Sequence, residues 1–223
     1  MALTGERVTE RFGGVVRSYA ELRELYGEPS ARAVEKDIGR LDEHCRAFLA
    51  RSRFMLLGTC GAEDRCDVSP KGDGPGFVLV LDEKTLAIPD RLGNRRIDSL
   101  RNIVENPHVG LLFVIPGMSE TLRVNGSAQI VRDEGLLERL AVEGKRPNVA
   151  IVVSVEECYL HCAKSFLRAE LWNPAKFIDR STFPSLARII EDHRRRPGTS
   201  VAEHERAVAE REEQVAEAYR CLY

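Results

Sequence analysis

The sequence predicts a mainly β protein with added helices, built around a mostly antiparallel β-barrel. Short strand-like segments follow one another closely between residues 54 and 156, and the connections between them are rich in turn residues. Helical segments interrupt or flank this series, whereas a doubly wound parallel sheet would need a helix after nearly every strand. Strands are expected at about residues 54–59, 65–69, 77–81, 85–88, 108–115, 122–131 and 149–156.

The first 50 residues are expected to form short helices that pack on the barrel. Residues 19–25 form an amphipathic segment, and apolar side chains recur at helical spacing over residues 38–49. A small helix is also expected at about 134–142, between two strands. We therefore assign residues 1–50 to an N-terminal helical segment and 51–175 to the barrel domain.

The chain becomes helical again after the last predicted strand. Helical patterns cover residues 162–168 and 186–190, and a longer one follows from about residue 199. Charged residues at the intermediate seam positions of this last helix weaken a coiled-coil interpretation. We therefore expect residues 176–223 to form a C-terminal helical extension whose last helix lies on the barrel or on a partner subunit. Its apolar positions, at seven-residue intervals, are Val201, Val208, Val215 and Leu222.

Composition and charge limit the partners and the compartment. The chain has 223 residues, of which 43% are hydrophobic, and 33 Lys and Arg against 35 Asp and Glu give a net charge of −2. This balance provides no overall field that would attract nucleic acid or an acidic membrane surface. The longest apolar runs are too short to span a bilayer, and no apolar leader for export is evident. We therefore expect a cytoplasmic protein with reduced cysteines and neither membrane nor nucleic-acid partners.

Residues 89–104 carry the pattern of a turn followed by a helix. Asn94 is a competent N-cap, so the helix should begin near Arg95. Arg95 and Arg96 would then lie on the first turn, where unpaired N–H groups and partial positive charge make each cation cost roughly 0.3–1 kcal/mol without a counterion. An anion reverses that sign, so the geometry suits a phosphate group. The apolar positions of this helix are Ile97, Leu100 and Val104.

The alternative for these arginines is that both are solvated and partly neutralised by Asp90 and Asp98. The segment 67–77 is a candidate second wall of the same site, because it adds a serine and a lysine to three glycines and two prolines. Pro70 is expected to prevent regular pairing, which leaves the Ser69 hydroxyl and the Lys71 amine beside free backbone N–H groups. A plain type I or II turn explains the glycines equally well, but not the serine and lysine.

Residues 158–162 contain two cysteines and a histidine, which are common zinc ligands. A tetrahedral zinc site needs about four ligands, and no companion Cys-x-x-Cys or His pair is present in the sequence. We therefore predict no metal site and expect His161 to cap a helix or contact a partner subunit. No Ser/His/Asp set or Gly-rich nucleotide loop can be assigned either, so the catalytic residues stay unknown.

Four short motifs follow one another along the chain: Ser69-Pro70-Lys71-Gly72, Ile88-Pro89-Asp90 with Gly93-Asn94-Arg95-Arg96, Asn106-Pro107-His108-Val109, and Leu122-Arg123-Val124-Asn125-Gly126. In this order and spacing they resemble the pyridoxamine 5'-phosphate oxidase-related family of FMN-binding split-barrel proteins. The resemblance covers about residues 50–175. It implies a split β-barrel that forms a homodimer with flavins at the subunit interface.

The resemblance also implies roles for individual residues. The basic pair that binds the flavin phosphate in this family falls on Arg95 and Arg96, with Asn94 as a small polar partner. The lysine beside the isoalloxazine ring falls on Lys71, and Ser69 would lie along the same edge of the flavin. The motifs add Pro70 and Pro89 to the expected cofactor-binding residues.

Two positions depart from the pattern of the oxidases. Thr121 stands where a longer side chain, usually glutamine, reaches the flavin from the second subunit. Cys66 stands where the oxidases have an arginine, and Arg65 lies one residue earlier. Because a one-residue slip in a strand reverses the facing of a side chain, Arg65 is not expected to replace that arginine.

The oxidases also carry a carboxy-terminal tryptophan and arginine for the phosphate of the vitamin. Here Arg168 and Trp172 are four residues apart and, in a helix, would share one face with Lys164. We expect these three side chains to close over the cofactor from the partner chain. The alternative is that they pack and pair at the surface.

Together, the resemblance and the charges at the expected helix terminus predict an FMN-dependent oxidoreductase that acts on an unidentified small molecule. One alternative is a flavin or haem protein that binds without turnover, with His108 and His161 as candidate axial ligands. Another is a reductase that uses the deazaflavin F420 on the same fold.

Overall fold

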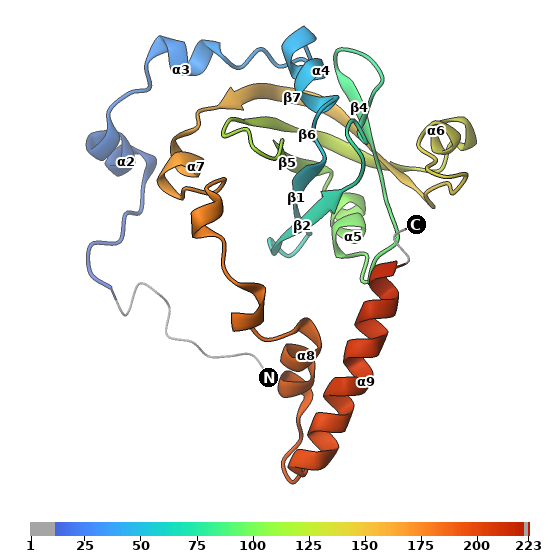
Figure 1. The fold of residues 1–223 in the computed structure, drawn as a ribbon. Helices are drawn as coiled ribbons and strands as arrows, with labels where there is room; N and C mark the ends of the chain where they lie inside the picture. Colours follow the sequence, from blue (N-terminus) through green and yellow to red (C-terminus); the bar gives the residue numbers. More distant parts are fainter. Residues whose placement is uncertain (1–11, 221–222) are drawn as a thin grey trace. The chain divides into compact units, whose positions relative to one another are not determined.

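The computed structural model describes residues 12–220 and residue 223 of the chain (Figure 1). The chain forms two compact units, Met1–Asp37 and Ile38–Tyr223. The division into an N-terminal segment, a barrel domain and a C-terminal extension at residues 50 and 175 stays a prediction.

The described part of the first unit contains the short helices α2 (Tyr19–Tyr26) and α3 (Ala31–Glu35). The side chains of Ser18 and Ser30 cap their amino ends by accepting hydrogen bonds from the first turn. None of the residues in these two helices is buried. The helix expected at residues 19–25 is confirmed by α2.

The second unit is built on a seven-stranded antiparallel sheet with the strand order β2-β1-β5-β6-β7-β4-β3. Strands β2 and β3 lie at the two edges, so the sheet is open. This arrangement confirms the expected mainly β, antiparallel split barrel with added helices. The strands are β1 (Phe54–Cys60), β2 (Cys66–Gly72), β3 (Leu79–Val80), β4 (Thr85–Pro89), β5 (His108–Val114), β6 (Thr121–Val131) and β7 (Ala150–His161).

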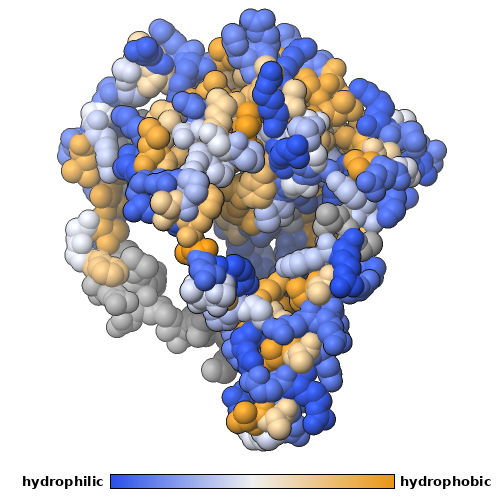
Figure 2. Space-filling view, viewed as in Figure 1, coloured by the Kyte–Doolittle hydropathy of each residue, from blue (hydrophilic) through white to orange (hydrophobic). Residues whose placement is uncertain are grey.

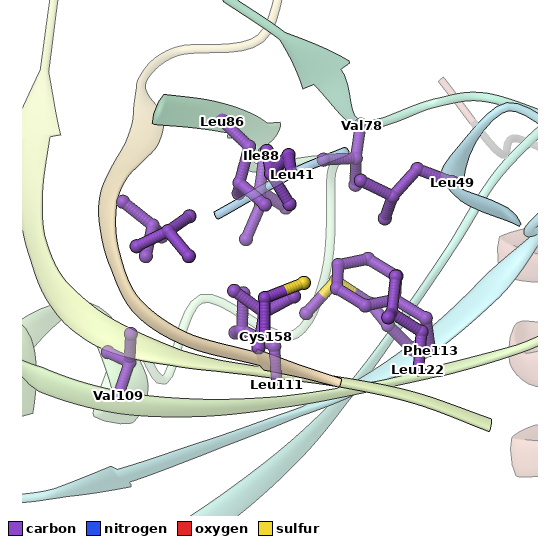
Figure 3. Close-up of a cluster of buried hydrophobic side chains, with 14 of the residues drawn as sticks. Leu41, Leu49, Val78, Leu86, Ile88, Val109, Leu111, Phe113, Leu122 and Cys158 are labelled. Carbon is purple, nitrogen blue, oxygen red and sulfur yellow. The ribbon is translucent and has the colours of Figure 1, made fainter. Parts of the chain in front are cut away.

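The core packs against the inner face of this sheet (Figure 3). In β1, Met55 and Leu57 are fully buried, because alternate residues of a strand point to the same face. Phe113 from β5 and Leu122 from β6 lie in the same cluster. Burying one side chain of this size stabilises the fold by roughly 1.5–3 kcal/mol. The central strands therefore form a rigid support for the edge strand β2.

Helix α4 (Glu43–Leu49) closes part of this core. Asp42 caps the helix by accepting a hydrogen bond of 2.8 Å from the Cys45 N–H. That hydrogen bond lowers the pKa of Asp42. The apolar stripe expected over residues 38–49 is confirmed from Leu41 onwards, whereas Ile38 is exposed.

The helices α8 (Leu186–Arg194) and α9 (Val201–Arg220) pack against each other. Arg188 holds Glu205 through two hydrogen bonds of 2.8 and 2.6 Å, and the buried His204 contacts Asp192 at 2.7 Å. The surface of α9 is mostly hydrophilic (Figure 2), as its thin apolar stripe predicts. The long terminal helix is confirmed, and Leu222 lies outside the described residues.

The other helices connect the strands or follow β7. Within the described part of the chain, no helix is long and apolar enough to cross a membrane. The helices are α5 (Asp98–Glu105), α6 (Glu134–Arg139), α7 (Lys164–Arg168), α8 (Leu186–Arg194) and α9 (Val201–Arg220), with short 3-10 turns at Pro174–Lys176 and Arg180–Thr182.

Candidate functional site

A cavity of about 810 Å³ opens between the edge strand β2 and the segment that leads from β4 into α5. This volume falls in the range of roughly 300–1,000 Å³ that is usual for small-molecule sites. The two motifs that contain Lys71 and Arg95 therefore meet at one cavity, although about 20 residues separate them. The predicted cofactor-binding residues in its lining are Ser69, Pro70, Lys71, Pro89, Asn94, Arg95 and Arg96.

Strand β2 supplies one wall of this cavity. Its register against β1 places Ser69 opposite Leu57 and Lys71 opposite Met55. Opposed residues of an antiparallel pair share a face, so these polar side chains continue the face on which β1 carries core residues. The inner face of the sheet thus changes from apolar to polar between β1 and β2.

The expectation that Pro70 prevents regular pairing is wrong. Pro70 lies within the β1–β2 ladder, opposite Leu56. The hydrogen bond from Gly61 N–H to Arg65 O fixes the alternation of this ladder and makes Leu56–Pro70 a non-hydrogen-bonded pair. The nitrogen of Pro70 therefore points away from β1, and an edge strand tolerates a missing donor there. The neighbouring N–H groups, which were expected to be free, point toward β1 instead.

The helix after the cavity begins three residues later than expected. Helix α5 starts at Asp98, and Arg95 and Ile97 have φ angles of 60° and 53°, which do not occur within a right-handed helix. Asn94 does not cap the helix; its Oδ1 accepts a hydrogen bond of 3.0 Å from the Arg96 N–H. Such a local turn competes with helix formation. Arg95 and Arg96 therefore lie in the loop before α5, not on its first turn.

Helix α5 also buries a different face from the expected one. Ile97 and Val104 are 62% and 77% exposed, whereas Ser99, Asn102 and Ile103 are buried. The spacing of the buried residues is also helical, but two of them are polar, so hydropathy alone does not identify this face. The expected apolar stripe is therefore wrong at its first and last positions.

The two buried polar residues of α5 connect the helix to the sheet. Ser99 Oγ donates to Asp67 Oδ2 of β2 at 2.9 Å, and Asn102 Nδ2 donates to Thr59 Oγ1 of β1 at 3.0 Å. Buried polar groups need such partners, because an unsatisfied group costs free energy. These hydrogen bonds hold the amino end of α5 beside the cavity.

Most cations of the cavity are paired with carboxylates. Lys71 Nζ lies 2.8 Å from Asp90 Oδ1, and Arg96 Nε lies 2.7 Å from Asp98 Oδ2. Arg95 forms neither a hydrogen bond nor an ion pair with any of the described residues. The alternative interpretation is that Asp90 and Asp98 partly neutralise both arginines. Asp98 does pair with Arg96, but Asp90 pairs with Lys71, so Arg95 has no counterion among the described residues. The charged lining residues are Asp67, Lys71, Asp90, Arg91, Arg95, Arg96 and Asp98.

A further set of contacts holds the loop that carries Arg91. Arg91 Nε lies 2.6 Å from Asp73 Oδ2, and the Tyr223 hydroxyl donates to Asp73 Oδ1 at 2.5 Å. The Arg91 guanidinium also lies 5.7 Å from the centre of the Tyr223 ring. Lys145 Nζ donates to the Tyr223 carbonyl oxygen at 2.9 Å. No local sequence pattern indicates these contacts, because Asp73 and Tyr223 are 150 residues apart.

These contacts shift two pKa values in opposite directions. Burial raises the pKa of Asp73, but hydrogen bonds from Tyr223, the Gly74 N–H and Arg91 outweigh burial and lower the pKa below its ordinary value of 3.8. The hydrogen bond to Asp73 raises the pKa of Tyr223 above its ordinary value of 10.0. The charged Asp73 and the neutral Tyr223 therefore stabilise each other.

Other residues singled out in the barrel lie away from the cavity of the same chain. Thr121 is 4% exposed and begins β6, opposite Val114 and His161. Arg65 lies in the β1–β2 turn and pairs with Glu63 at 2.6 Å. Neither Thr121 nor Arg65 belongs to the lining of the cavity.

The expected helix face of Lys164, Arg168 and Trp172 is only partly formed. Helix α7 contains the lysine and the arginine but ends at Arg168. Trp172 follows in a turn, where its indole N–H donates to the Met118 carbonyl oxygen at 2.9 Å and its ring lies 5.9 Å from Phe166. The expectation of one shared face is therefore wrong for Trp172, because the helix is too short to include it.

The cysteines and the histidine of residues 158–162, at the end of β7, differ in their exposure to solvent. Cys158 is buried, Cys162 is exposed, and the His161 ring lies 5.1 Å from the Tyr159 ring. Among residues 12–220 and 223, no group of three or more His, Cys, Asp or Glu side chains is arranged to hold a metal ion.

An open antiparallel barrel of this kind defines a split-barrel protein, and the charged cavity beside its edge strand is a candidate small-molecule site. Residues 41–162 match the family model of pyridoxamine 5'-phosphate oxidase, which is more than half of the chain. The chain therefore belongs to the pyridoxamine 5'-phosphate oxidase-related family, and the resemblance noted in the sequence is confirmed.

Solved structures similar to this chain include HupZ from Group A Streptococcus, at 18% identity over 53% of this chain and 92% of that chain, with a TM-score of 0.44. An FMN-binding protein from Syntrophomonas wolfei shares 12% identity over 64% of this chain and 96% of that chain, with a TM-score of 0.42. An F420 reductase shares 19% identity over 52% of this chain and 94% of that chain, with a TM-score of 0.38. A comparison with curated proteins found no match.

Proposed function

We propose that this protein binds FMN in the cavity beside β2 and acts as an FMN-dependent oxidoreductase on a small molecule. The observation that carries the proposal is Arg95, a cation in the cavity lining without a counterion among the described residues. A flavin phosphate supplies the missing anion. Each charge-assisted hydrogen bond to the phosphate would contribute about 1.5–3 kcal/mol.

The phosphate end of the ligand is assigned to the loop before α5. Arg95 provides a free guanidinium, and Arg96 provides a second one whose pairing with Asp98 is exposed and easily exchanged. The side chain of Asn94 holds this turn through the Arg96 N–H. Two guanidinium groups with planar donor arrays match the geometry of phosphate oxygens better than lysines would. In this proposal the loop before α5 binds the phosphate, a role that the sequence predicts for the first turn of the helix.

The ring end of the ligand is assigned to the inner face of β2. Ser69 offers a hydroxyl and Lys71 an ammonium group on that face, while Pro70 and Pro89 limit the cavity. Bound FMN would supply the electron and hydride transfer, for which protein side chains have no equivalent. Lys71, held by Asp90, would place positive charge near the ring and so favour the electron-rich reduced flavin. No catalytic acid or base is assigned.

A second copy of the chain is proposed to complete the site. Thr121, Lys164, Arg168 and Trp172 lie outside the cavity of their own chain, so any contact with the flavin would have to come from the partner. Helix α7 and the segment that follows it also expose large apolar side chains, which a homodimer interface would cover. Those side chains, between 46% and 70% exposed, are Leu167, Leu171, Phe177, Ile178 and Phe183.

Reconstitution tests the proposal against its alternatives. The purified protein is titrated separately with FMN, F420 and haem, and binding is followed by absorbance and by the gain in melting temperature. We expect FMN to bind and to raise the melting temperature most. If the protein binds F420 more tightly than FMN, the proposed site stays the same but its cofactor is F420. Binding of haem alone would contradict the proposal, since neither His108 nor His161 lines the cavity. A response to none of the three would also overturn it.

A further inference from the structure

The hairpin that joins β1 to β2 places two thiols directly opposite each other. Cys60 is the last residue of β1, Cys66 is the first residue of β2, and the two are paired in the ladder. The hydrogen bond of 3.2 Å from Gly61 N–H to Arg65 O, one step nearer the turn, makes Cys60–Cys66 a non-hydrogen-bonded pair. Opposed Cα atoms in such pairs are about 4.5 Å apart, and their side chains approach most closely.

This position suits a disulfide bond. Disulfides join cysteines whose Cα atoms are about 4.4–6.8 Å apart and whose side chains point the same way. Both conditions hold for two residues opposed in an antiparallel ladder, and both thiols are free. Burial and the interaction with the Cys66 thiol raise the pKa of Cys60.

The pair is also open to reagents in solution. Cys66 is exposed and Cys60 is half-buried, on the face of β2 opposite to Ser69 and Lys71. The other close pair, Cys45 and Cys158, has its sulfur atoms 3.3 Å apart, but both residues are buried. Among the described cysteines, Cys60 and Cys66 are therefore the pair in which two thiols face each other and solvent can reach them.

We propose that Cys60 and Cys66 are a thiol–disulfide exchange site that takes a low-molecular-weight disulfide of the glutathione class as its oxidant. The Cys66 thiolate attacks one sulfur of the oxidant, whose sulfur–sulfur bond breaks and releases one thiol. The Cys60 thiolate then attacks the Cys66 sulfur of the mixed disulfide and releases the second thiol. The protein loses two electrons and two protons, and the oxidant is reduced to two thiols.

The cross-link would fix the turn that α5 contacts. Ala62 N–H donates to Glu105 Oε2 of α5 at 3.2 Å, and Asp67, the residue after Cys66, accepts the hydrogen bond from Ser99. A covalent bond between the strand ends limits the opening of this hairpin. Amide hydrogen exchange over residues 61–65 is therefore expected to slow on oxidation.

Peptide mapping tests the exchange directly. The reduced full-length protein is incubated with oxidised glutathione, free thiols are alkylated, and the protein is digested with trypsin without reduction. Cleavage after Arg53, Arg65 and Lys71 separates residues 54–65 from residues 66–71 unless a disulfide joins them. We expect these two peptides to be recovered as one linked species. Recovery of alkylated Cys66, or of Cys66 in a stable mixed disulfide with glutathione, would overturn the proposal.

Single variants separate the two steps. Cys60→Ser should trap glutathione on Cys66, because the second thiol is gone, whereas Cys66→Ser should leave Cys60 largely alkylated. Cys162→Ser is the matched control, since it removes an exposed cysteine outside the hairpin and should leave the linked peptides unchanged. If Cys60→Ser released both glutathione thiols as the parent protein does, Cys60 would not be the resolving residue and the proposal would fail.

Discussion

Ser99 on the first turn of α5 donates a hydrogen bond of 2.9 Å to Asp67 on the inner face of β2. This contact joins the two elements that form opposite walls of the cavity. We expect Ser99→Ala to lower the free energy of unfolding by about 1–3 kcal/mol, because the side chain of Asp67 loses a hydrogen-bond donor. Urea denaturation measures the change. Ser154→Ala, at an exposed position of β7, is the control and should stay within about 0.5 kcal/mol of the parent.

The hydrogen bond between Asn102 and Thr59 is buried. Its removal should therefore lower the free energy of unfolding more than removal of a surface contact would. We expect Asn102→Ala to cost about 1–3 kcal/mol, since the Thr59 hydroxyl is left unsatisfied. A double-mutant cycle with Thr59→Val isolates the pairwise term, which should be about 0.5–3 kcal/mol. Additive effects of the two changes would show that the residues do not interact.

Two neighbouring residues of α5 test which face of the helix is buried. Ile103 is 3% exposed and packs in the core, whereas Val104 is 77% exposed. Ile103→Ala should therefore lower the free energy of unfolding by about 2–5 kcal/mol, while Val104→Ala should change it by less than about 0.5 kcal/mol. Equal losses from the two changes would indicate that the helix is rotated from the orientation described.

The contact between Tyr223 and Asp73 predicts a pH window for stability. The pKa of Asp73 is lowered, so its contribution is present above about pH 3.8 and is lost as the pH falls through the folded-state pKa. The pKa of Tyr223 is raised, so its contribution is present below about pH 10.0 and is lost as the pH rises through the folded-state pKa. The contact therefore stabilises the protein between these limits.

The variant Tyr223→Phe should remove this contribution. Melting temperatures of the parent and the variant should differ most near neutral pH and converge in acid and in alkali. Tyr219→Phe, at an exposed position of α9, should follow the parent at every pH. A difference between parent and Tyr223→Phe that does not change with pH would contradict the account of this contact.

Short apolar runs between turn residues were sufficient to locate the strands of the barrel. Residues 54–57 of β1 are all apolar, so hydropathy identifies the strand, but the alternate burial of Met55 and Leu57 is visible only in the structure. Hydropathy could not identify β2 as an edge strand, because strand order depends on contacts between distant segments. From the sequence alone, Pro70 therefore predicts a break in the strand, although an edge position accommodates it.

The candidate site was predictable in its residues more than in its geometry. The two motifs with Lys71 and Arg95 do line one cavity. The helix start was wrong because the Asn94 side chain can serve a helix cap or a local turn equally well, and only the left-handed backbone of Arg95 and Ile97 decides between them. The contact of Asp73 with Tyr223 could not be predicted, since no local pattern connects residues so far apart.

In the proposed site, Arg95 binds the phosphate of FMN. FMN and riboflavin share the isoalloxazine ring, and riboflavin lacks the phosphate, so the two ligands separate the ends of the site. Arg101→Ala is a matched control, because Arg101 is an exposed arginine of α5 that pairs with Glu105 and does not line the cavity.

The most direct measurement is isothermal titration of the parent, Arg95→Ala and Arg101→Ala with both flavins. Loss of a charge-assisted contact of about 1.5–3 kcal/mol should raise the Kd of Arg95→Ala for FMN about ten- to hundredfold. Its Kd for riboflavin should stay unchanged, and Arg101→Ala should match the parent for both ligands. Equal FMN affinity in Arg95→Ala and the parent, or an equal loss of affinity for FMN and riboflavin, would contradict this assignment.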